Sequence, residues 1–426
     1  MKYILKMAFR NIGRNKRRTI LSASAISVAV MVILIMRGYI GGVIDSMFDS
    51  VTKIATGHIK IAHTKYLEKE DMMPLEYKID GFDGSGYKQL IPILESFQEV
   101  KIISPRIKFS VLLSFNEKTS SAMGIGIDPA KESAIMSFDK VMIDGRYFRT
   151  DKDKRSIIIG SALADKLGIK TGDKLTILAR TAYDSLKGMT FDVVGIFRYG
   201  ISAIDDKLFY IPIESAVKLL EMGNGVSEII LMIEKAENAE KVANKIKESF
   251  RNHKGFYLDD STLRYDVIPW QQQGGYLGFI KSAQYTYNIA YICLLILAST
   301  VIINTTMMVI YERIKEIGTI GALGMRGNQI VLLFTLESAI VSTIGSFIGT
   351  VIGGCIDLLL SIKGIDFNAL SGGSLNMVIT DIIYPRFNLS ILLQSFMFGV
   401  IVASAIAYIP ARRSARIDPI EALRSI

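Results

Sequence analysis

Four long uncharged segments alternate with charged stretches along the chain. They cover residues 20–36, 285–310, 338–356 and 387–411. A helix needs about 17–25 predominantly apolar residues to cross the hydrocarbon core of a bilayer, and each segment approaches or exceeds that length. The pattern therefore predicts four transmembrane helices, at residues 20–44, 284–310, 329–361 and 387–409.

The long polar stretch at residues 45–283 predicts one extramembrane domain, which is large enough to have its own core. Apolar runs at residues 58–62 and 156–160 indicate strands, and residues 236–250 have the spacing of a surface helix. A β-rich subdomain is expected at about residues 105–212. The predicted fold class is a membrane α-helical protein with four transmembrane helices and a large exported α+β domain inserted between helices 1 and 2.

Basic residues set the expected orientation. Seven Lys and Arg residues and no acid precede the first apolar segment, and four Arg residues follow the last one against two acids. By the positive-inside rule, the basic N-terminal segment at residues 1–19 and the tail at residues 410–426 are cytoplasmic. The domain and a loop at residues 362–386 are then periplasmic. We expect the first helix to remain uncleaved, because no small-x-small site follows its apolar run.

The charge and the sequence motifs argue against chemistry in this chain. The net charge of +9 comes from bases that flank the spans, which predicts contact with membrane lipid and no nucleic acid. The sequence contains no P-loop, and His58 and His63 are expected on opposite faces of a strand. Cys293 and Cys355 both fall in predicted spans, without metal-ligand spacing. We expect a non-catalytic protein with no catalytic residue, bound cofactor or metal.

The connector between the second and third spans, residues 311–328, has an unusual pattern. Ile314, Ile317, Ile320 and Leu323 recur at about one helical turn, while charged residues occupy the other faces. Glycines recur every third residue from position 318 to position 327, although glycine destabilises a helix interior by about 1 kcal/mol relative to alanine. The pattern predicts a short amphipathic helix at the membrane surface that contacts a partner closely or contains a bend.

Three motifs resemble ABC-transporter permeases of the MacB/FtsX/LolC–LolE superfamily. The connector sequence ERIKEIGTIGALG, residues 312–324, is similar to that family's cytoplasmic coupling helix. Residues 408–424 resemble its ending P-A-x-x-A-x-x-x-D-P-x-E-A-L-R, and residues 7–18 resemble its N-terminal entry. The lipoprotein-releasing LolC/LolE branch is the most similar, although its members usually have a basic residue where this chain has Gly321.

The resemblance implies a defined assembly. Two permease copies, identical or related, would pair with a dimer of a separate cytoplasmic ABC ATPase, which would bind ATP and Mg. The coupling helix would dock on that ATPase and transmit its movement to the spans. The implied ATPase-coupling residues are Glu312, Arg313, Lys315, Glu316, Ile317, Gly318, Leu323 and Gly324.

Other residues in the spans suggest a substrate surface and helix contacts. Glu337 is expected to pair with juxtamembrane bases, to belong to the transmission path, or to couple to protons. Gly345, Gly349 and Gly353 predict close helix packing, expected against the fourth span. A candidate apolar substrate groove comprises Met36, Tyr39, Ile40, Met47, Phe48 and Phe279, for which core packing or lipid contact is the alternative.

Three functions follow from the resemblance. The first is ATP-driven extraction of lipoproteins from the bacterial inner membrane, with transfer to a periplasmic carrier. The second is MacB-like export of peptides or small molecules. The third is FtsX-like activation of cell-wall hydrolases, for which the exported domain is large.

Overall fold

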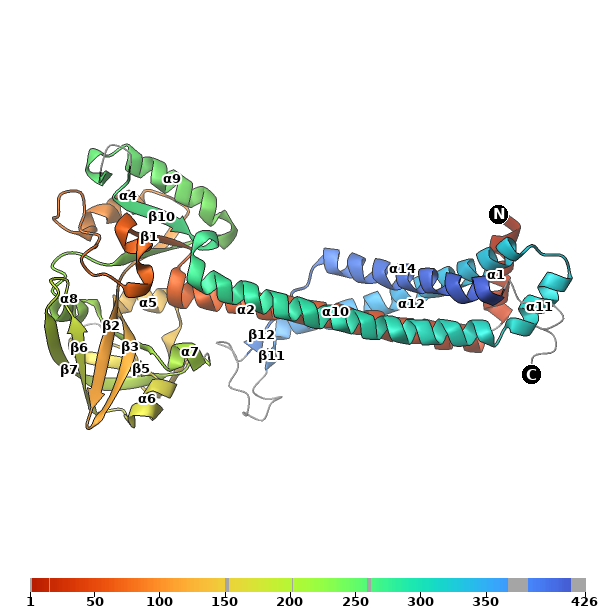
Figure 1. Cartoon of the computed structure of the whole chain (residues 1–426), viewed down its shortest axis with the longest axis horizontal. Coiled ribbons are helices and arrows are strands. Elements are labelled where there is room, and N and C mark those ends of the chain that lie inside the picture. Colours follow the sequence, from red (N-terminus) through yellow and green to blue (C-terminus); the bar gives the residue numbers. More distant parts are fainter. Residues whose placement is uncertain are drawn as a thin grey trace. The chain divides into compact units, whose positions relative to one another are not determined.

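A computed structural model describes residues 2–14, 16–149, 153–200, 202–258, 262–366 and 382–414. The chain divides into two compact units (Figure 1). The helical unit comprises Met1–Ser46, Ser282–Phe367 and Ile382–Ile426, and the domain unit comprises Met47–Lys281 and Asn368–Asp381.

Long helices account for most of the helical unit. They are α1 (Lys2–Arg14), α2 (Lys16–Val51), α10 (Gly274–Tyr311), α11 (Ile314–Ala322), α12 (Gly327–Lys363) and α14 (Leu389–Ser414). Within the described residues, four stretches are long and apolar enough to cross a membrane: Thr19–Thr56, Ile280–Thr305, Gly327–Lys363 and Leu389–Ile409. The predicted number of four spanning helices is confirmed.

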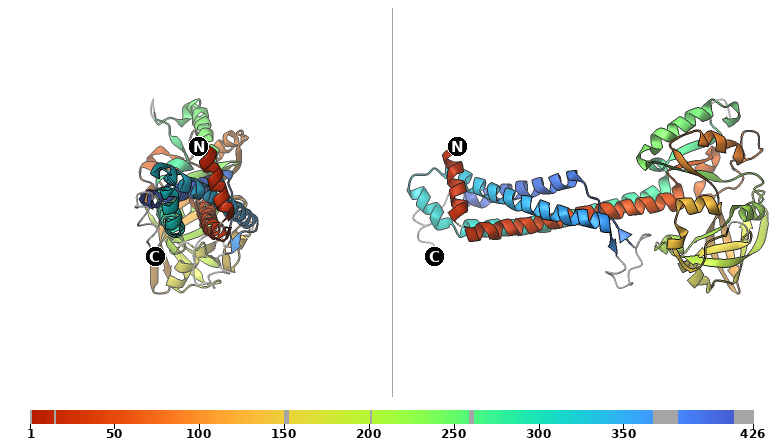
Figure 2. Two further views of the ribbon diagram at one scale, coloured as in Figure 1. Left: turned by 90° about the vertical axis from the view of Figure 1, so that its right-hand side faces the viewer. Right: turned by 180° about the vertical axis from the view of Figure 1, so that it is seen from behind.

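The three glycines of α12 pack against α2, so the expected contact with the fourth span is wrong. A Cβ atom on Gly345 would lie 2.6 Å from the carbonyl oxygen of Ala23, and one on Gly349 would collide with the carbonyl of Ser27. Small residues at four-residue spacing therefore stand on both helices, and the two backbones approach closely. Helix α14 packs beside α12 at a different position, where Gly399 faces Ser346 (Figure 2).

The segment just before α14 is fixed to α2. The backbone N–H of Arg386 donates to the carbonyl of Gly38 at 2.9 Å, and the Arg386 guanidinium pairs with Asp45. A short two-stranded sheet, β11 (Ile365–Asp366) with β12 (Ile382–Ile383), flanks the loop predicted at residues 362–386. Residues 367–381 of that loop lie outside the described ranges.

A ten-stranded mixed sheet forms the domain unit. Its order is β10-β1-β9-β2-β3-β8-β5-β7-β4, and β6 pairs with both β2 and β7. The strands are β1 (Ile59–His63), β2 (Val100–Phe115), β3 (Lys118–Ile127), β4 (Met142–Gly145), β5 (Ser156–Gly160), β6 (Lys174–Arg180), β7 (Leu186–Phe197), β8 (Leu208–Pro212), β9 (Glu228–Ile233) and β10 (Tyr265–Pro269). The helices between them are α3 (Thr64–Glu68), α4 (Ile91–Glu95), α5 (Pro129–Ile135), α6 (Ser161–Leu167), α7 (Ser202–Asp205), α8 (Ile213–Leu220) and α9 (Ala239–Arg251).

The long strand β2 belongs to two lobes of this sheet. Its first half pairs with β9, which continues through β1 to β10, and α9 packs its apolar face on this lobe. Its second half pairs with β6 as well as β3, so that β2-β3-β8-β5-β7-β6 closes into a ring. Ring closure leaves these six strands without a free edge over the paired region. The ring lies in the stretch for which a β-rich subdomain is predicted.

A buried arginine holds the segment that follows α2. This segment, η1 (Thr52–Thr56), is a π-helical turn. The Arg106 guanidinium, on β2, donates to the carbonyl oxygens of Ile54 (2.8 Å) and Lys53 (3.0 Å). It also forms a two-point ion pair with Glu132 of α5, at 2.6 and 2.8 Å. Both side chains are 1% exposed, so water does not compete for these bonds.

Candidate coupling site

The predicted connector helix is present as α11. It follows a two-residue break after α10, and Gly324, with φ +94°, lies in the turn that leads to α12. A positive φ is unfavourable for residues with a side chain, so glycine suits this turn. Gly318 is buried, and Ile320 packs on a cluster formed by Ile330, Phe334, Ala407 and Ala411 of α12 and α14.

Arg313 connects the start of α11 to the third span. Its Nε donates to Glu316 at 2.7 Å, and its Nη1 donates to Glu337 of α12. The guanidinium also lies over the Phe334 ring, 4.7 Å from the centroid. The Arg313 and Glu337 side chains are 7% and 8% exposed. The prediction that Glu337 pairs with a juxtamembrane base is confirmed, and its partner is Arg313.

Helix α1 adds one hydrogen bond and one ion pair to the contacts of Arg313, Glu316 and Glu337, and these residues together form a polar network. Asn11 donates its side-chain amide to the second oxygen of Glu337 at 2.6 Å, and Arg14 lies 4.0 Å from Glu316. From the sequence, residues 1–19 were predicted to be a basic cytoplasmic segment with the family's N-terminal motif, and this helix was missed. The signal for it was the helical spacing of Ile4, Ala8 and Ile12, which contribute half-buried or buried side chains.

The predicted coupling residues divide between two faces. Arg313 and Glu316 face the network, whereas Leu323, with 83% of its surface exposed, and Glu312 face outward with Gly324. The side chains of Lys315 and Ile317 lie outside what the structure describes. The inward face is thus bound to α12 and α1, and the exposed Glu312 and Leu323 stand at opposite ends of α11. This arrangement can pass a displacement of α11 directly into α12.

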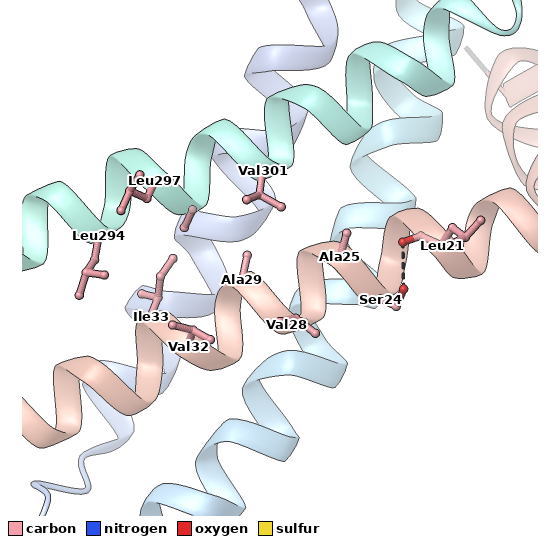
Figure 3. A pocket seen from close by; sticks show the side chains of 11 residues that line it. Leu21, Ser24, Ala25, Val28, Ala29, Val32, Ile33, Leu294, Leu297 and Val301 are labelled. Carbon is pink, nitrogen blue, oxygen red and sulfur yellow. Dashed lines mark hydrogen bonds between the residues drawn. The ribbon is translucent and has the colours of Figure 1, made fainter. Parts of the chain in front are cut away.

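An apolar groove lies between α2 and α10 (Figure 3). It has a volume of about 510 Å³, and its walls come from Leu21, Val28 and Ile33 on α2 and Leu294 and Val301 on α10. Among the described residues that line it, Ser24 has the only polar side chain, and its hydroxyl already donates to the carbonyl of Leu21. The groove therefore suits a hydrocarbon chain or an apolar helix.

Among the candidate substrate residues predicted from the sequence, those whose side chains the structure describes do not line this groove. Ile40 is buried, and Met36 and Tyr39 are half-buried in the helical unit. Met47 and Phe48 belong to the domain unit, where the Phe48 ring meets Trp270 edge-on at 4.2 Å. The side chain of Phe279 lies outside the described part of the chain. A substrate role for these residues stays a prediction.

Two family models match the chain. The MacB-like periplasmic core domain matches residues 19–249, and the FtsX-like permease C-terminal domain matches residues 288–419. The first match includes most of α2 and most of the domain unit, and the second includes α11 with Arg313, Glu316 and Glu337. The chain belongs to the MacB/FtsX/LolC superfamily of ABC transporter permeases.

Several members of this superfamily resemble the chain to a similar degree. An uncharacterized ABC transporter permease of Methanocaldococcus jannaschii is 26% identical, over 99% of this chain and 97% of the relative. LolC of the lipoprotein-releasing system of Xylella fastidiosa (strain Temecula1) is 24% identical, over 75% of this chain and 77% of the relative. The macrolide export protein MacB of Bdellovibrio bacteriovorus is 23% identical, over 99% of this chain and 61% of the relative. The extracellular domain of the transporter YknZ matches 49% of this chain and 98% of its own length, at 18% identity and a TM-score of 0.34.

Proposed function

We propose that this chain is the membrane subunit of an ATP-driven transporter that extracts lipoproteins from the outer leaflet of the bacterial inner membrane. A dimer of a separate cytoplasmic ATPase, which holds ATP and Mg, acts on α11. A second permease copy, identical or related, completes the membrane part. The termini are cytoplasmic, the domain unit is periplasmic, and a periplasmic carrier accepts the cargo.

The buried link between Arg313 and Glu337 is the observation that carries the transport proposal. A partner that moves the outward face of α11 must also move Arg313, which pairs with Glu337 on α12 and through it with Asn11 on α1. Breaking a buried ion pair by losing one partner costs about 3–5 kcal/mol, so the link is stiff compared with an exposed pair. The geometry supports transmission of force in a chain for which we expect no catalytic chemistry of its own.

An acylated cargo is supported by the groove between α2 and α10. Acyl chains are apolar, and a transporter that lifts them from a bilayer needs an apolar surface among its spans. The groove supplies such a surface, with a single hydroxyl that is already satisfied. The similarity to LolC over three quarters of the chain supports the same cargo.

MacB-like export is the second candidate function. It is supported by the match of residues 19–249 to the MacB-like periplasmic core domain. In this case, the cargo would reach the periplasmic domain directly, and the groove would hold another transmembrane helix.

Depletion of the protein in its host separates the two candidates. Mature lipoproteins should accumulate in the inner membrane when cell membranes are fractionated after depletion. A matched strain that expresses a variant with an intact fold but a blocked coupling face, Leu323→Asp, should show the same accumulation. Normal lipoprotein sorting after full depletion would reject lipoprotein release and favour MacB-like export.

A further inference from the structure

Two cavities adjoin beneath strands β2 and β3 of the domain unit. The larger one has a volume of about 440 Å³ and the smaller one about 180 Å³. They share a wall made of Ala55, Met73, Lys108 and Met123. The larger cavity falls in the usual size range of small-molecule sites, ~300–1,000 Å³.

The larger cavity is mainly apolar. Ile54, Ala122, Ile125 and Leu208 contribute aliphatic side chains, each less than 10% exposed. The two methionines of the shared wall are unbranched and can adapt to chains of different shape. Such a cavity accepts a flexible hydrocarbon chain.

The smaller cavity contains two buried ammonium groups. Lys60 is 3% exposed and Lys108 is 6% exposed. The Lys60 ammonium pairs with Glu70 at 2.5 Å, and the Lys108 ammonium binds the carbonyl of Ala55 at 2.8 Å and a carboxylate oxygen of Glu228 at 2.9 Å. An ammonium has three N–H donors, so both lysines keep donor capacity beyond these contacts.

Two further polar groups line the smaller cavity without a described partner. The Tyr66 hydroxyl and the Gln273 carbonyl oxygen are buried, and neither makes a hydrogen bond to a residue that the structure describes. Buried polar atoms are normally satisfied, so groups of this kind indicate a missing ligand or water. Lys60, Lys108 and Tyr66 can donate hydrogen bonds into the cavity, but Glu70 and Glu228 already neutralise the two ammonium charges, and Asp71 also lines the cavity. The site therefore favours an uncharged head group with acceptor oxygens over an anion.

We propose that the two cavities form a binding site for a fatty-acyl ester, whose chain occupies the larger cavity and whose uncharged ester head lies between Lys60, Lys108 and Tyr66. The identification of the bound molecule as acylated cargo rests on the proposed function. Binding itself needs no ATPase and no carrier.

The smaller cavity is lined by residues that adjoin two long helices in the sequence. Ala55 and Thr56 belong to the π-helical turn that follows α2, and Gln273 and Gly274 stand at the beginning of α10. All four line the smaller cavity. A head group in this cavity therefore touches the domain ends of the chain segments that continue into both helices.

Photolabelling tests the site in the full-length chain. The protein is placed in lipid nanodiscs with a monoacylglycerol that carries a diazirine in its palmitoyl chain, irradiated, and digested, and the labelled peptides are quantified by mass spectrometry. Peptides of the spans take up the probe from the membrane and serve as an internal reference. We expect strong labelling of the peptides that contain Val111 and Met123, and competition by unlabelled monopalmitoylglycerol but not by hexadecane.

Variants distinguish the site from general lipid contact. Tyr66→Phe combined with Lys60→Met removes two head-group donors, and Ala122→Leu fills the apolar cavity. Each should reduce domain labelling at least fivefold relative to the spans. The control Lys245→Met removes an exposed lysine paired with Glu99 and should leave labelling unchanged. Labelling confined to the spans, or equal domain labelling in all variants, would overturn the site. Normal lipoprotein sorting after depletion, together with labelled cavities, would reject only the proposed cargo.

Discussion

Arg313 and Glu337, 24 residues apart in the sequence, form a buried ion pair that joins the start of α11 to the interior of α12. Neither residue could hold its charge there alone at low cost, because an isolated buried charge is strongly unfavourable. The pair therefore makes the position of the connector helix depend on the position of the third span.

Loss of one partner should be more harmful than loss of both. We expect Glu337→Leu to destabilise the protein by about 3 kcal/mol, because Arg313 would remain buried without its principal partner. The double variant Arg313→Met, Glu337→Leu should recover most of that loss. The measurement is thermal unfolding of the purified chain in detergent. Equal unfolding temperatures for the single variant and the unchanged protein would show that the Arg313–Glu337 pair does not stabilise the fold.

The outward face of α11 should be required for ATPase binding and not for folding. Leu323→Asp places a charge where an exposed apolar side chain stands, and we expect at least a tenfold loss of copurifying ATPase with no change in unfolding temperature. Tyr183→Asp is a matched control, since Tyr183 is 72% exposed in the domain unit. Undiminished copurification of the Leu323 variant would place the ATPase contact elsewhere.

The crossing of α2 and α12 should tolerate no side chain at Gly349. Gly349→Ala should lower stability by about 1–3 kcal/mol, because its methyl group would overlap the Ser27 carbonyl and force the helices apart. Gly278→Ala in α10 meets nothing within 4 Å and should be neutral or stabilising by up to about 1 kcal/mol. The two unfolding midpoints, measured in one detergent, should therefore shift in opposite directions. A Gly349 variant as stable as the Gly278 variant would contradict the close crossing.

The domain unit should lose stability in mild acid through His63. Burial, with Arg264 nearby, lowers the pKa of His63 from 6.5 to about 4. The unfolded chain therefore binds a proton at higher pH than the folded one, so stability is unaffected above about pH 7 and falls as the pH drops from 6.5 towards 4. The expected loss between pH 7 and pH 5 is about 2 kcal/mol, at about 1.4 kcal/mol per pKa unit.

His63→Asn should reduce this dependence while keeping the local hydrogen bond. Burial also lowers the pKa of His58, so a smaller dependence of the same sign should remain. His63 caps α3 by accepting from the backbone N–H of Lys65 at 3.2 Å, and asparagine is a favourable capping residue. The measurement is the difference in unfolding free energy between pH 7 and pH 5 for the variant and the unchanged protein. The exposed His253, changed to Asn, is the control. An identical pH dependence in all three proteins would exclude His63 as its source.

Local sequence patterns predicted the elements that local forces determine. The run at residues 156–160 is β5, fully buried, because a short unbroken series of isoleucines fits only an interior strand. The sequence KTGD at residues 170–173 is typical of a turn, and Gly172 has a φ of +94° there, just before β6. The connector helix and the number of spans followed from spacing and length in the same way.

Features that depend on distant parts of the chain could not be predicted in this way. The closed ring requires β2 to pair with β6, about 65 residues further on, and no local pattern specifies that partner. Glycine spacing in α12 indicated close packing but not which helix would supply the other surface. Asn11 was missed because its partner, Glu337, is 326 residues away.

The joint that Arg106 makes with the turn after α2 depends on no side chain of that turn. The guanidinium binds the backbone oxygens of Lys53 and Ile54, and every amino acid supplies such an oxygen. Residues 52–56 can therefore diverge while the attachment is kept, provided that Arg106 and Glu132 are retained.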